Sequence, residues 1–434
     1  MKLAVESLAQ GGDGLARHPD SGEVIFVPGG LPGDEFEVTL AKRRKVLRAR
    51  VVRRLKDSPH RQTAVCDSRP KCGGCSWQEL VVEQAMAWKG RLLVGSLSRF
   101  ARQNPKDLEM LLEPIPVKHR GRHRVMMRVD PSGRLAYHQA ASHDLVVPTA
   151  CPALHPRLES VARGLEQIAP LLQGQIVEVA MGLDGSGESR AVRLHPRPRR
   201  RGEATPMTRQ GLKSLAQTIV NRGIAEGAWA ESEDGQLVVS GNVELGGHLA
   251  GDPRFTVRAG LFYQADPAVN ASMGTELLRM VNPRKGLRVL DMHAGAGNFA
   301  LALALARCRV QASEVDAEAF QDLSRNAKRL GQGARLEPLR MTAAQALSRA
   351  SQRRPPAVVV FDGPRGGDRE GAQAIARFQP PKVVAFGCDR VTFARDLAEM
   401  GLGTRYALHR VGYWDAFPWT HHLEAFALLE LKGA

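Results

Sequence analysis

The stretch VLDMHAGAGNFALALA, residues 289–304, decides the fold of the carboxyl-terminal part of the chain. A short apolar strand is predicted to end at Asp291, Gly295 and Gly297 lie in a turn, and Ala300–Ala306 has the pattern of an apolar helix. Glycines in such a unit let the backbone approach a ligand closely, although a tight turn without a ligand has the same pattern. The stretch therefore predicts one strand and one helix of an α/β sheet.

An acidic residue further along the chain favours a bound ligand at this turn. In nucleotide-binding folds, an acid about 20 residues after the first strand end holds ribose hydroxyls, and Glu314 has this position relative to Asp291. The turn lacks the third glycine of the dinucleotide fingerprint. We therefore expect a mononucleoside-like cofactor, S-adenosylmethionine, in preference to NAD.

Further short apolar runs follow the same plan. From about Phe255 onward, the runs Val310–Glu314, Ala357–Phe361 and Val383–Phe386 alternate with helix-like segments. This alternation predicts a parallel, doubly wound sheet, in which sites lie at the carboxyl ends of the strands.

Two of these strand ends carry reactive groups. Asp362 follows one strand in FDGPRGG, and Cys388 follows the next in FGCDR. A lone cysteine at a strand end is commonly an inert packed thiol, and we expect this of Cys308, which lies in an apolar stretch. Cys388 differs because Glu424 opens the last predicted strand of the same sheet, so that a nucleophile and a base could converge.

The first 56 residues are expected to form β structure. Val24–Val27 is a short apolar strand, residues 28–34 have turn chemistry, and residues 36–40 alternate between apolar and polar. Lys42–Lys56 contains basic residues and no acid, and apolar side chains alternate with arginines within it. Since short strands must pair or close to remove exposed edges, a small antiparallel β-barrel with a basic face is predicted.

Four cysteines suggest a metal centre between the barrel and the sheet. Cys66, Cys72 and Cys75 lie on a glycine-rich turn before a predicted helix from Trp77 to about Phe100, and Cys151 follows later. Zinc and an iron–sulfur cluster both take four thiolates. Zinc ribbons usually pair two short knuckles, and only one such pair is present here, so a cluster is favoured and zinc remains the alternative.

Composition indicates a polyanionic partner. The 434 residues include 61 Lys+Arg and 45 Asp+Glu, giving a net charge of +16, which favours nucleic acid ahead of an anionic membrane. Two more basic stretches support this: Lys118–Arg128, expected to form a strand face, and Arg190–Arg201, expected to be a loop. All three basic stretches precede the predicted sheet. Six cysteines, with no secretory signal and no long apolar segment, indicate a reducing, cytoplasmic setting.

The chain resembles the RNA uracil-5 methyltransferases, which make 5-methyluridine, over essentially its whole length. The opening GDGLARHPDSGEVIFVPGGLPGDEFEV resembles the family's TRAM domain, an RNA-binding β-barrel, and CDSRPKCGGCSWQEL with Cys151 resembles its 4Fe-4S site. The segments LFYQADPAVN, DMHAGAGNF, EVD, FDGPRGG, FGCDR and FPWTHHLEAF resemble its catalytic signatures in order.

The resemblance implies a role for each matching residue. The nucleophile would be Cys388 and the proton acceptor Glu424. S-adenosylmethionine would be surrounded by Gln264, His293, Asn298, Glu314 and Asp362, and the cluster would be bound by Cys66, Cys72, Cys75 and Cys151. A thiolate adding to uracil C6 would make C5 nucleophilic, and a base would then remove the C5 proton. The target uridine should be flipped out of any helix or lie in a loop.

The implied architecture is a multidomain α/β protein. Residues 1–56 would be the TRAM-like, OB-like barrel, residues 57–255 a central α+β iron–sulfur and RNA-binding domain, and residues 256–434 a Rossmann-like methyltransferase. The cluster favours 23S rRNA as substrate, with tRNA as the alternative. We expect a monomer without a membrane partner.

Three departures from the family pattern concern the site. His293 replaces Phe or Tyr, residues 387–390 read GCDR instead of SCNP, and residues 362–365 read DGPR instead of DPPR. The cysteine and the acids are retained, so activity is expected. The competing interpretations are a radical methylthiotransferase, which has a different cysteine spacing and domain order, and an RNA-binding protein with a decayed catalytic domain.

Overall fold

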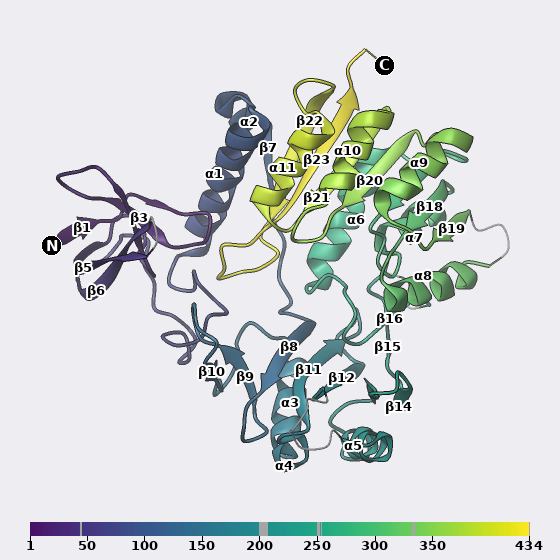
Figure 1. Cartoon of the computed structure of the whole chain (residues 1–434), viewed down its shortest axis with the longest axis horizontal. Coiled ribbons are helices and arrows are strands. Elements are labelled where there is room, and N and C mark those ends of the chain that lie inside the picture. The colour runs from purple at the N-terminus through teal and green to yellow at the C-terminus, as the bar shows by residue number, and fades with distance from the viewer. Residues whose placement is uncertain (44–45, 199–206, 250–251, 253, 332–334, 434) are drawn as a thin grey trace.

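The computed structural model describes the chain except for residues 44–45, 199–206, 250–251, 253, 332–334 and 434. The amino-terminal strands form a lobe on the left of Figure 1, a second sheet lies at the bottom, and the carboxyl-terminal sheet with its helices occupies the upper right. Among the described residues, no helix has the length and apolar character needed to span a bilayer.

The amino-terminal lobe is a curled six-stranded sheet, and the strands predicted around residues 24–27 and 36–40 are confirmed. The strands are β1 (Lys2–Ala4), β2 (Ser7–Leu8), β3 (Gly14–Arg17), β4 (Val24–Val27), β5 (Glu35–Arg43) and β6 (Val46–Lys56). They pair in the order β1-β5-β6-β4-β3-β2, with Leu3, Ile25, Phe36 and Val38 in the core. The pairing of β4 with β6 is parallel, so the sheet is not antiparallel throughout as expected.

The basic strand β6 departs from the predicted alternation. Ala49 faces the core, but Val51 is 43% exposed. The pairing of β5 with β6 shifts register between Glu37 and Val38, and such a bulge changes the direction in which side chains point. Several cations of β6 are also in ion pairs, namely Arg48 with Asp13, Arg53 with Glu37, and Lys56 with Glu35.

The helix after the cysteine turn begins later than predicted. It is α1 (Val82–Ala101), whereas Trp77 is buried in a turn before it. Leu93 and Leu97 of α1 pack into the hydrophobic core of the carboxyl-terminal sheet. The chain continues through α2 (Pro105–Leu111) to the short strand β7 (Leu112–Ile115).

The central region contains a seven-stranded sheet with helices on it. Its strands are β8 (Arg124–Val129), β9 (Leu135–His138), β10 (Leu145–Val146), β11 (Ile176–Leu183), β12 (Arg190–Pro196), β13 (Gly227–Glu231) and β14 (Leu237–Gly241), in the order β10-β9-β8-β11-β12-β13-β14. The helices are α3 (Pro156–Glu166), α4 (Ala169–Leu172) and α5 (Arg209–Asn221). A small hairpin follows, formed by β15 (Glu244–Gly246) and β16 (Thr256–Arg258).

Two predictions for this region were wrong. The strand face expected over Lys118–Arg128 begins only at Arg124, since the residues before it form the connection that crosses from the carboxyl-terminal sheet. The loop expected over Arg190–Arg201 is strand β12 as far as Pro196, because it pairs on both sides, with β11 and β13. Residues 199–201 lie outside the described residues.

The carboxyl-terminal sheet is doubly wound, as predicted. Its strands are β17 (Arg288–Met292), β18 (Arg309–Ser313), β19 (Leu336–Leu339), β20 (Val358–Asp362), β21 (Lys382–Gly387), β22 (Tyr406–Trp414) and β23 (Glu424–Leu431), in the order β19-β18-β17-β20-β21-β23-β22-β7. The pairs from β19 to β21 are parallel, while β23 is antiparallel to both neighbours.

Helices cover both faces of this sheet. They are α6 (Pro267–Val281), α7 (Asn298–Leu305), α8 (Ala317–Arg329), α9 (Ala343–Arg353), α10 (Arg369–Phe378) and α11 (Arg390–Met400). Alternate residues of one strand enter two separate cores: Val359 and Phe361 lie in one, and Val358 and Val360 in the other. Apolar strands of this kind are buried on both faces.

The division of the chain at residues 56 and 255 remains a proposal. Strand β7, which is far from residue 255 along the chain, pairs with β22 at the edge of the carboxyl-terminal sheet. The segment with α1 and β7 therefore packs with the carboxyl-terminal sheet, although it lies within the expected central domain.

Candidate active site and cysteine pocket

The carboxyl ends of the parallel strands bring the predicted residues together. Strand order reverses between β17 and β20, and ligands of doubly wound sheets bind at such a switch point. Asp291 lies near the end of β17 and Asp362 ends β20, while Cys388 follows β21 directly. Glu314 follows β18 directly. The sequence pattern predicts this convergence because each strand is a short apolar run.

A cavity at this edge contains most of the residues expected around the cofactor. Gln264, His293, Asn298 and Asp362 line it together with Asp291. Glu314 lies at its margin, where its Oε2 accepts a hydrogen bond from the Gly295 N–H at 2.9 Å. The glycine turn is tightly packed, because a Cβ added at Gly297 would lie 2.9 Å from the Leu323 side chain.

Asp291 places a buried carboxyl group in the cavity that lacks a well-placed hydrogen-bond donor. Its side chain is buried, and neither carboxylate oxygen forms a hydrogen bond of ordinary geometry with a described residue, although the Ala300 N–H approaches it and lowers its pKa. Burial, together with the neighbouring Asp362, raises the pKa of Asp291 well above its usual value. Buried acceptors without partners are destabilising unless a ligand satisfies them. The cavity therefore fits a ligand with N–H or O–H donors, as S-adenosylmethionine has.

His293 and Asn298 are held by neighbours rather than free in the cavity. His293 has a positive φ of 64°, and its Nε2 lies 2.9 Å from Asp368 Oδ2. Asn298 exchanges hydrogen bonds of 2.8 and 3.0 Å with the side chain of Asn270. An imidazole at this position thus adds a polar contact with Asp368 that Phe would lack.

Strand register places Cys388 beside Glu424. Gly387 is paired with Ala425 across β21 and β23, so the next residues of the two strands are Cys388 and Glu424. Glu424 is only 2% exposed. Burial, Glu424 and Asp362 raise the pKa of Cys388 to about 12, and burial with Asp362 raises the pKa of Glu424 well above its usual value. The Cys388 thiol is therefore protonated at pH 7, and the shift at Glu424 favours its neutral form.

Two neighbours of this pair were missed from the sequence. Arg124 opposes the rise in the pKa of Glu424, and its own pKa is lowered chiefly by burial. Its guanidinium lies 4.6 Å from the ring centre of Phe262, a side chain that is 62% exposed and lines the cofactor cavity. A cation and an exposed ring beside a nucleophile form a surface for a planar base. In the sequence, the only signal for Arg124 is the alternation of basic residues over Lys118–Arg128, and no pattern singles out Phe262.

The departures at Asp389 and Arg390 connect the nucleophile to the amino-terminal lobe. Asp389 caps α11, accepting hydrogen bonds from the Val391 and Thr392 N–H groups at 3.0 and 2.9 Å. Arg390 is buried and donates hydrogen bonds to the side chain and the carbonyl of Gln10, which lies between β2 and β3. Burial lowers the pKa of Arg390 to about 10, which leaves it charged at neutral pH.

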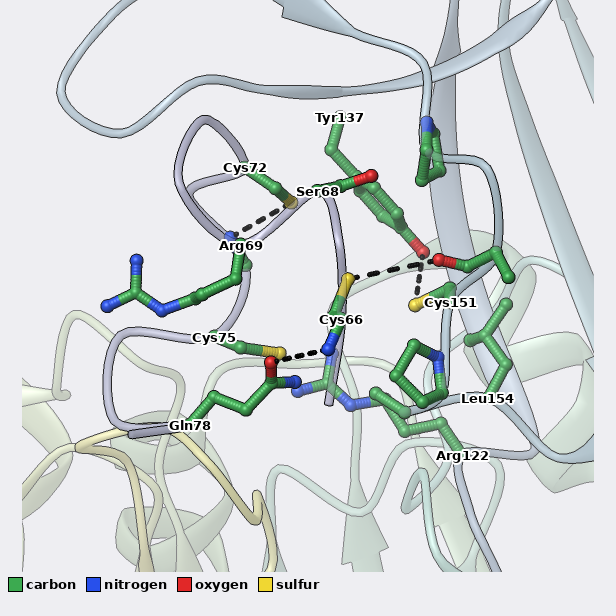
Figure 2. A pocket seen from close by; sticks show the side chains of 15 residues that line it. Cys66, Ser68, Arg69, Cys72, Cys75, Gln78, Arg122, Tyr137, Cys151 and Leu154 are labelled. Atoms are coloured by element: carbon green, nitrogen blue, oxygen red, sulfur yellow. Dashed lines mark hydrogen bonds between the residues drawn. The ribbon is translucent and has the colours of Figure 1, made fainter. Parts of the chain in front are cut away.

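The four predicted cysteine ligands line one pocket, which Figure 2 shows with their sulfurs directed toward a common space. All four are free thiols. The Gly74 N–H donates to Cys72 Sγ at 3.4 Å, and the Tyr137 hydroxyl donates to Cys151 Sγ at 3.6 Å. Burial raises the pKa of Cys75 to about 11, while nearby Arg122 lowers it.

Four thiols around one pocket are donors that either a single ion or a cluster could use. Among the described residues, no three His, Cys, Asp or Glu side chains lie close enough together to hold one metal ion. A single tetrahedral zinc needs four sulfurs at about 2.3 Å from one point, whereas each thiolate of a 4Fe-4S cluster binds a separate iron. Sulfurs arranged around a pocket, with donors to two of them, fit the second case.

Comparisons with known proteins agree with this geometry. A family model described as tRNA (Uracil-5-)-methyltransferase matches residues 252–432, and a TRAM domain model matches residues 1–52. The chain is 32% identical over 440 residues, 99% of its length and 94% of the relative's, to a Pseudomonas aeruginosa protein named 23S rRNA (uracil(1939)-C(5))-methyltransferase RlmD. A Halomonas elongata protein of the same name is also 32% identical, over 99% of this chain and 89% of its own.

A solved structure shows the same fold over the whole chain. It is the Pyrococcus abyssi tRNA (uracil-54, C5)-methyltransferase in complex with S-adenosyl-L-homocysteine, with a TM-score of 0.72, 19% identity and 99% coverage of both chains. The match in fold and the identity to relatives extend over every region described above, so the resemblance is confirmed. The chain belongs to the S-adenosylmethionine-dependent RNA uracil-5 methyltransferase family.

Proposed function

We propose that this protein methylates C5 of one uridine in 23S rRNA, with Cys388 as the nucleophile and Glu424 as the base. The observation that carries the proposal is the strand register that brings Cys388 and Glu424 together beside a cavity lined by Gln264, His293 and Asp362. S-adenosylmethionine, when bound in this cavity, would supply the methyl group and a positively charged sulfonium.

The chain's own residues carry out the covalent steps. The Cys388 thiol first gives its proton to solvent water, and its sulfur then forms a bond to uracil C6, so that the electron pair of the C5–C6 double bond moves onto C5 and O4. After C5 has gained the methyl group, the Glu424 carboxylate removes the C5 proton. The electron pair of that C–H bond restores the double bond and expels the Cys388 thiolate.

The electrostatics of the site disfavour the reactive thiolate of Cys388. Cys388, with a pKa of about 12, carries almost no thiolate at pH 7.5, and thiolate is the reactive form. Arg365 lowers the pKa of Cys388 and Arg124 lowers that of Glu424, whereas Asp362 raises both. A cationic ligand beside Asp362 would offset its charge and shift Cys388 toward the thiolate.

The choice of 23S rRNA rests on the relatives. The curated relatives with 32% identity are named for that substrate, and the solved structure of the same fold is named for tRNA. Transfer RNA is therefore the second candidate. We infer in addition that Cys66, Cys72, Cys75 and Cys151 hold a 4Fe-4S cluster, on the pocket geometry above, and that the protein acts as a monomer, which sedimentation would test.

Incubation with protein-free 23S rRNA and bulk tRNA in separate reactions tests the function. Each reaction contains S-adenosylmethionine with a labelled methyl group, and the product nucleoside is identified after digestion. We expect labelled 5-methyluridine at one position of 23S rRNA. Label in tRNA alone would establish the second candidate. Binding of S-adenosylmethionine without transfer to either RNA would contradict the enzymatic assignment.

A further inference from the structure

Arginines gather at the edge of the carboxyl-terminal sheet that is opposite the active site. Arg288 begins β17, Arg309 begins β18, and the two are direct partners in the parallel pairing. Arg335 precedes β19, and its carbonyl accepts a hydrogen bond from the Val310 N–H at 2.6 Å. With Arg354, which follows α9, these side chains line a hollow of about 300 Å³.

More cations surround this hollow. We call the set the basic edge, and it consists of Arg284, Lys285, Arg288, Arg307, Arg309, Arg335, Arg353 and Arg354. All of them except Arg335, which is half-buried, are exposed. The acid in the lining is Glu337, and it is already engaged by Arg349 at 3.2 Å and by Gln311 at 2.8 Å. Within the described part of the chain, no member of the basic edge forms an ion pair with a carboxylate.

Several other arginines of the carboxyl-terminal region are in ion pairs. Arg258 contacts Asp322 at 2.9 Å, and Arg369 contacts Glu399 at 2.9 Å. Arg410 contacts both Glu113 and Glu276. Arg340, Arg377 and Arg395 also lack a carboxylate partner among the described residues, but they do not line this hollow, so the basic edge is distinguished by the gathering of its cations around one hollow. Like charges placed together repel one another, so such a cluster is stabilised by an external anion.

The arrangement suits a chain of phosphates. Neighbouring strands lie about 4.8 Å apart, so the arginines that begin β17 and β18, with Arg335 before β19, stand in a row. Guanidinium groups bind phosphates through paired hydrogen bonds and are the usual choice for nucleic-acid backbones. We propose that the basic edge binds the phosphate backbone of an RNA segment remote from the target uridine, an inference that rests on the proposed RNA substrate.

The position of the basic edge determines which RNA can reach it. Strands of five residues separate it from the active site, which is about 15 Å at about 3.3 Å per residue. Because the sheet itself lies between the two sites, a short hairpin bound at the active site would have to bend around the sheet to reach this edge. A long folded RNA can pass around the side of the sheet and contact both.

Paired variants test the proposal with full-length protein. Arg309→Gln/Arg354→Gln removes two charges from the basic edge, and Arg377→Gln/Arg395→Gln removes two exposed arginines from α10 and α11 as a matched control. We measure the binding of two RNAs from low to high salt. They are protein-free 23S rRNA and a short hairpin that contains the unmodified target uridine. For 23S rRNA, we expect the basic-edge variant to lose affinity several-fold at low salt and the salt slope to fall by about 0.7–0.9 per lost contact.

The other measurements separate the possible outcomes. We expect the control variant to match the wild type on both RNAs, and the basic-edge variant to bind and methylate the hairpin normally. If the basic-edge variant has the same salt slope for 23S rRNA as the control variant, the proposal is overturned. If the first basic-edge variant melts at a lower temperature than the wild type, Arg284→Gln/Arg353→Gln provides a second one. Failure of the wild type to methylate any RNA would instead contradict the proposed function.

Discussion

The protein places buried thiols in two different electrostatic settings. In the cysteine pocket, the pKa of Cys75 is raised to about 11 by burial, and the charged neighbour with the largest influence is the cation Arg122, which lowers it. At the active site, the pKa of Cys388 is raised to about 12 by burial and by the acids Glu424 and Asp362. Burial keeps both thiols neutral, and the neighbours differ. The pocket can hold permanent thiolates once a metal binds, whereas Cys388 becomes a thiolate only when a substrate changes its surroundings.

The largest expected effect is the loss of methyl transfer in Cys388→Ala. Removal of a covalent nucleophile commonly costs a factor of about 10³ or more in rate, so we expect no detectable 5-methyluridine. RNA binding and iron content should be unchanged, because Cys388 belongs to neither the basic surfaces nor the cysteine pocket.

Cys308→Ala is the matched control for every cysteine variant. Cys308 is fully buried in an apolar core, and shortening it should reduce the free energy of unfolding by about 1 kcal/mol with normal activity. Full turnover by Cys388→Ala under the same conditions would remove Cys388 from the mechanism.

The next effect is a change of the end product in Glu424→Gln. Bond formation at C6 and methylation at C5 precede removal of the C5 proton, so the variant should accumulate a covalent protein–RNA adduct. A slowly migrating band on a denaturing gel measures it. The double variant Cys388→Ala/Glu424→Gln should show no band, and a band in that double variant would mean that another residue forms the bond.

The third effect is a loss of bound iron from the cysteine pocket. Anaerobic purification should give a brown protein with about four irons, and Cys75→Ser should lose most of the iron while Cys308→Ala and Cys388→Ala retain it. Iron analysis and the visible absorption spectrum provide the measurement. Stoichiometric zinc in the wild-type protein would contradict the cluster and restore the zinc alternative.

The smallest effect is a shift in the reactivity of Cys388 in Asp362→Asn. The Asp362 carboxylate, whose own pKa is about 6, is charged at pH 8–9 and raises the pKa of Cys388. Removing that charge lowers the pKa, so more thiolate is present and alkylation by iodoacetamide accelerates, by up to about tenfold per pKa unit. Mass spectrometry of the Cys388 peptide measures the rate, with Cys308 as the internal reference. Slower alkylation in the variant would mean that Asp362 lowers the pKa of Cys388 instead of raising it.

The sequence predicted the parts of the site that depend on local pattern. Asp362 and Cys388 were placed at strand ends because the apolar runs before them are short and unambiguous. Arg124 and Phe262 were missed because their meeting depends on packing between the central region and the carboxyl-terminal sheet. The basic edge was missed for a similar reason: its cations come from separate segments, none of which is a continuous basic run, so all RNA-binding charge was expected ahead of the sheet.

Strand β7 has a consequence for how the protein is made in the cell. Leu112 of β7 pairs with Val411 of β22, about 300 residues later in the chain, and synthesis proceeds at about 5–20 residues per second. The edge strand therefore leaves the ribosome roughly 15–60 seconds before its partner exists. The catalytic sheet cannot be completed by folding one region after another during translation. An enzyme that acts on ribosomal RNA would then reach its active form only after its own ribosome has made both of these distant strands.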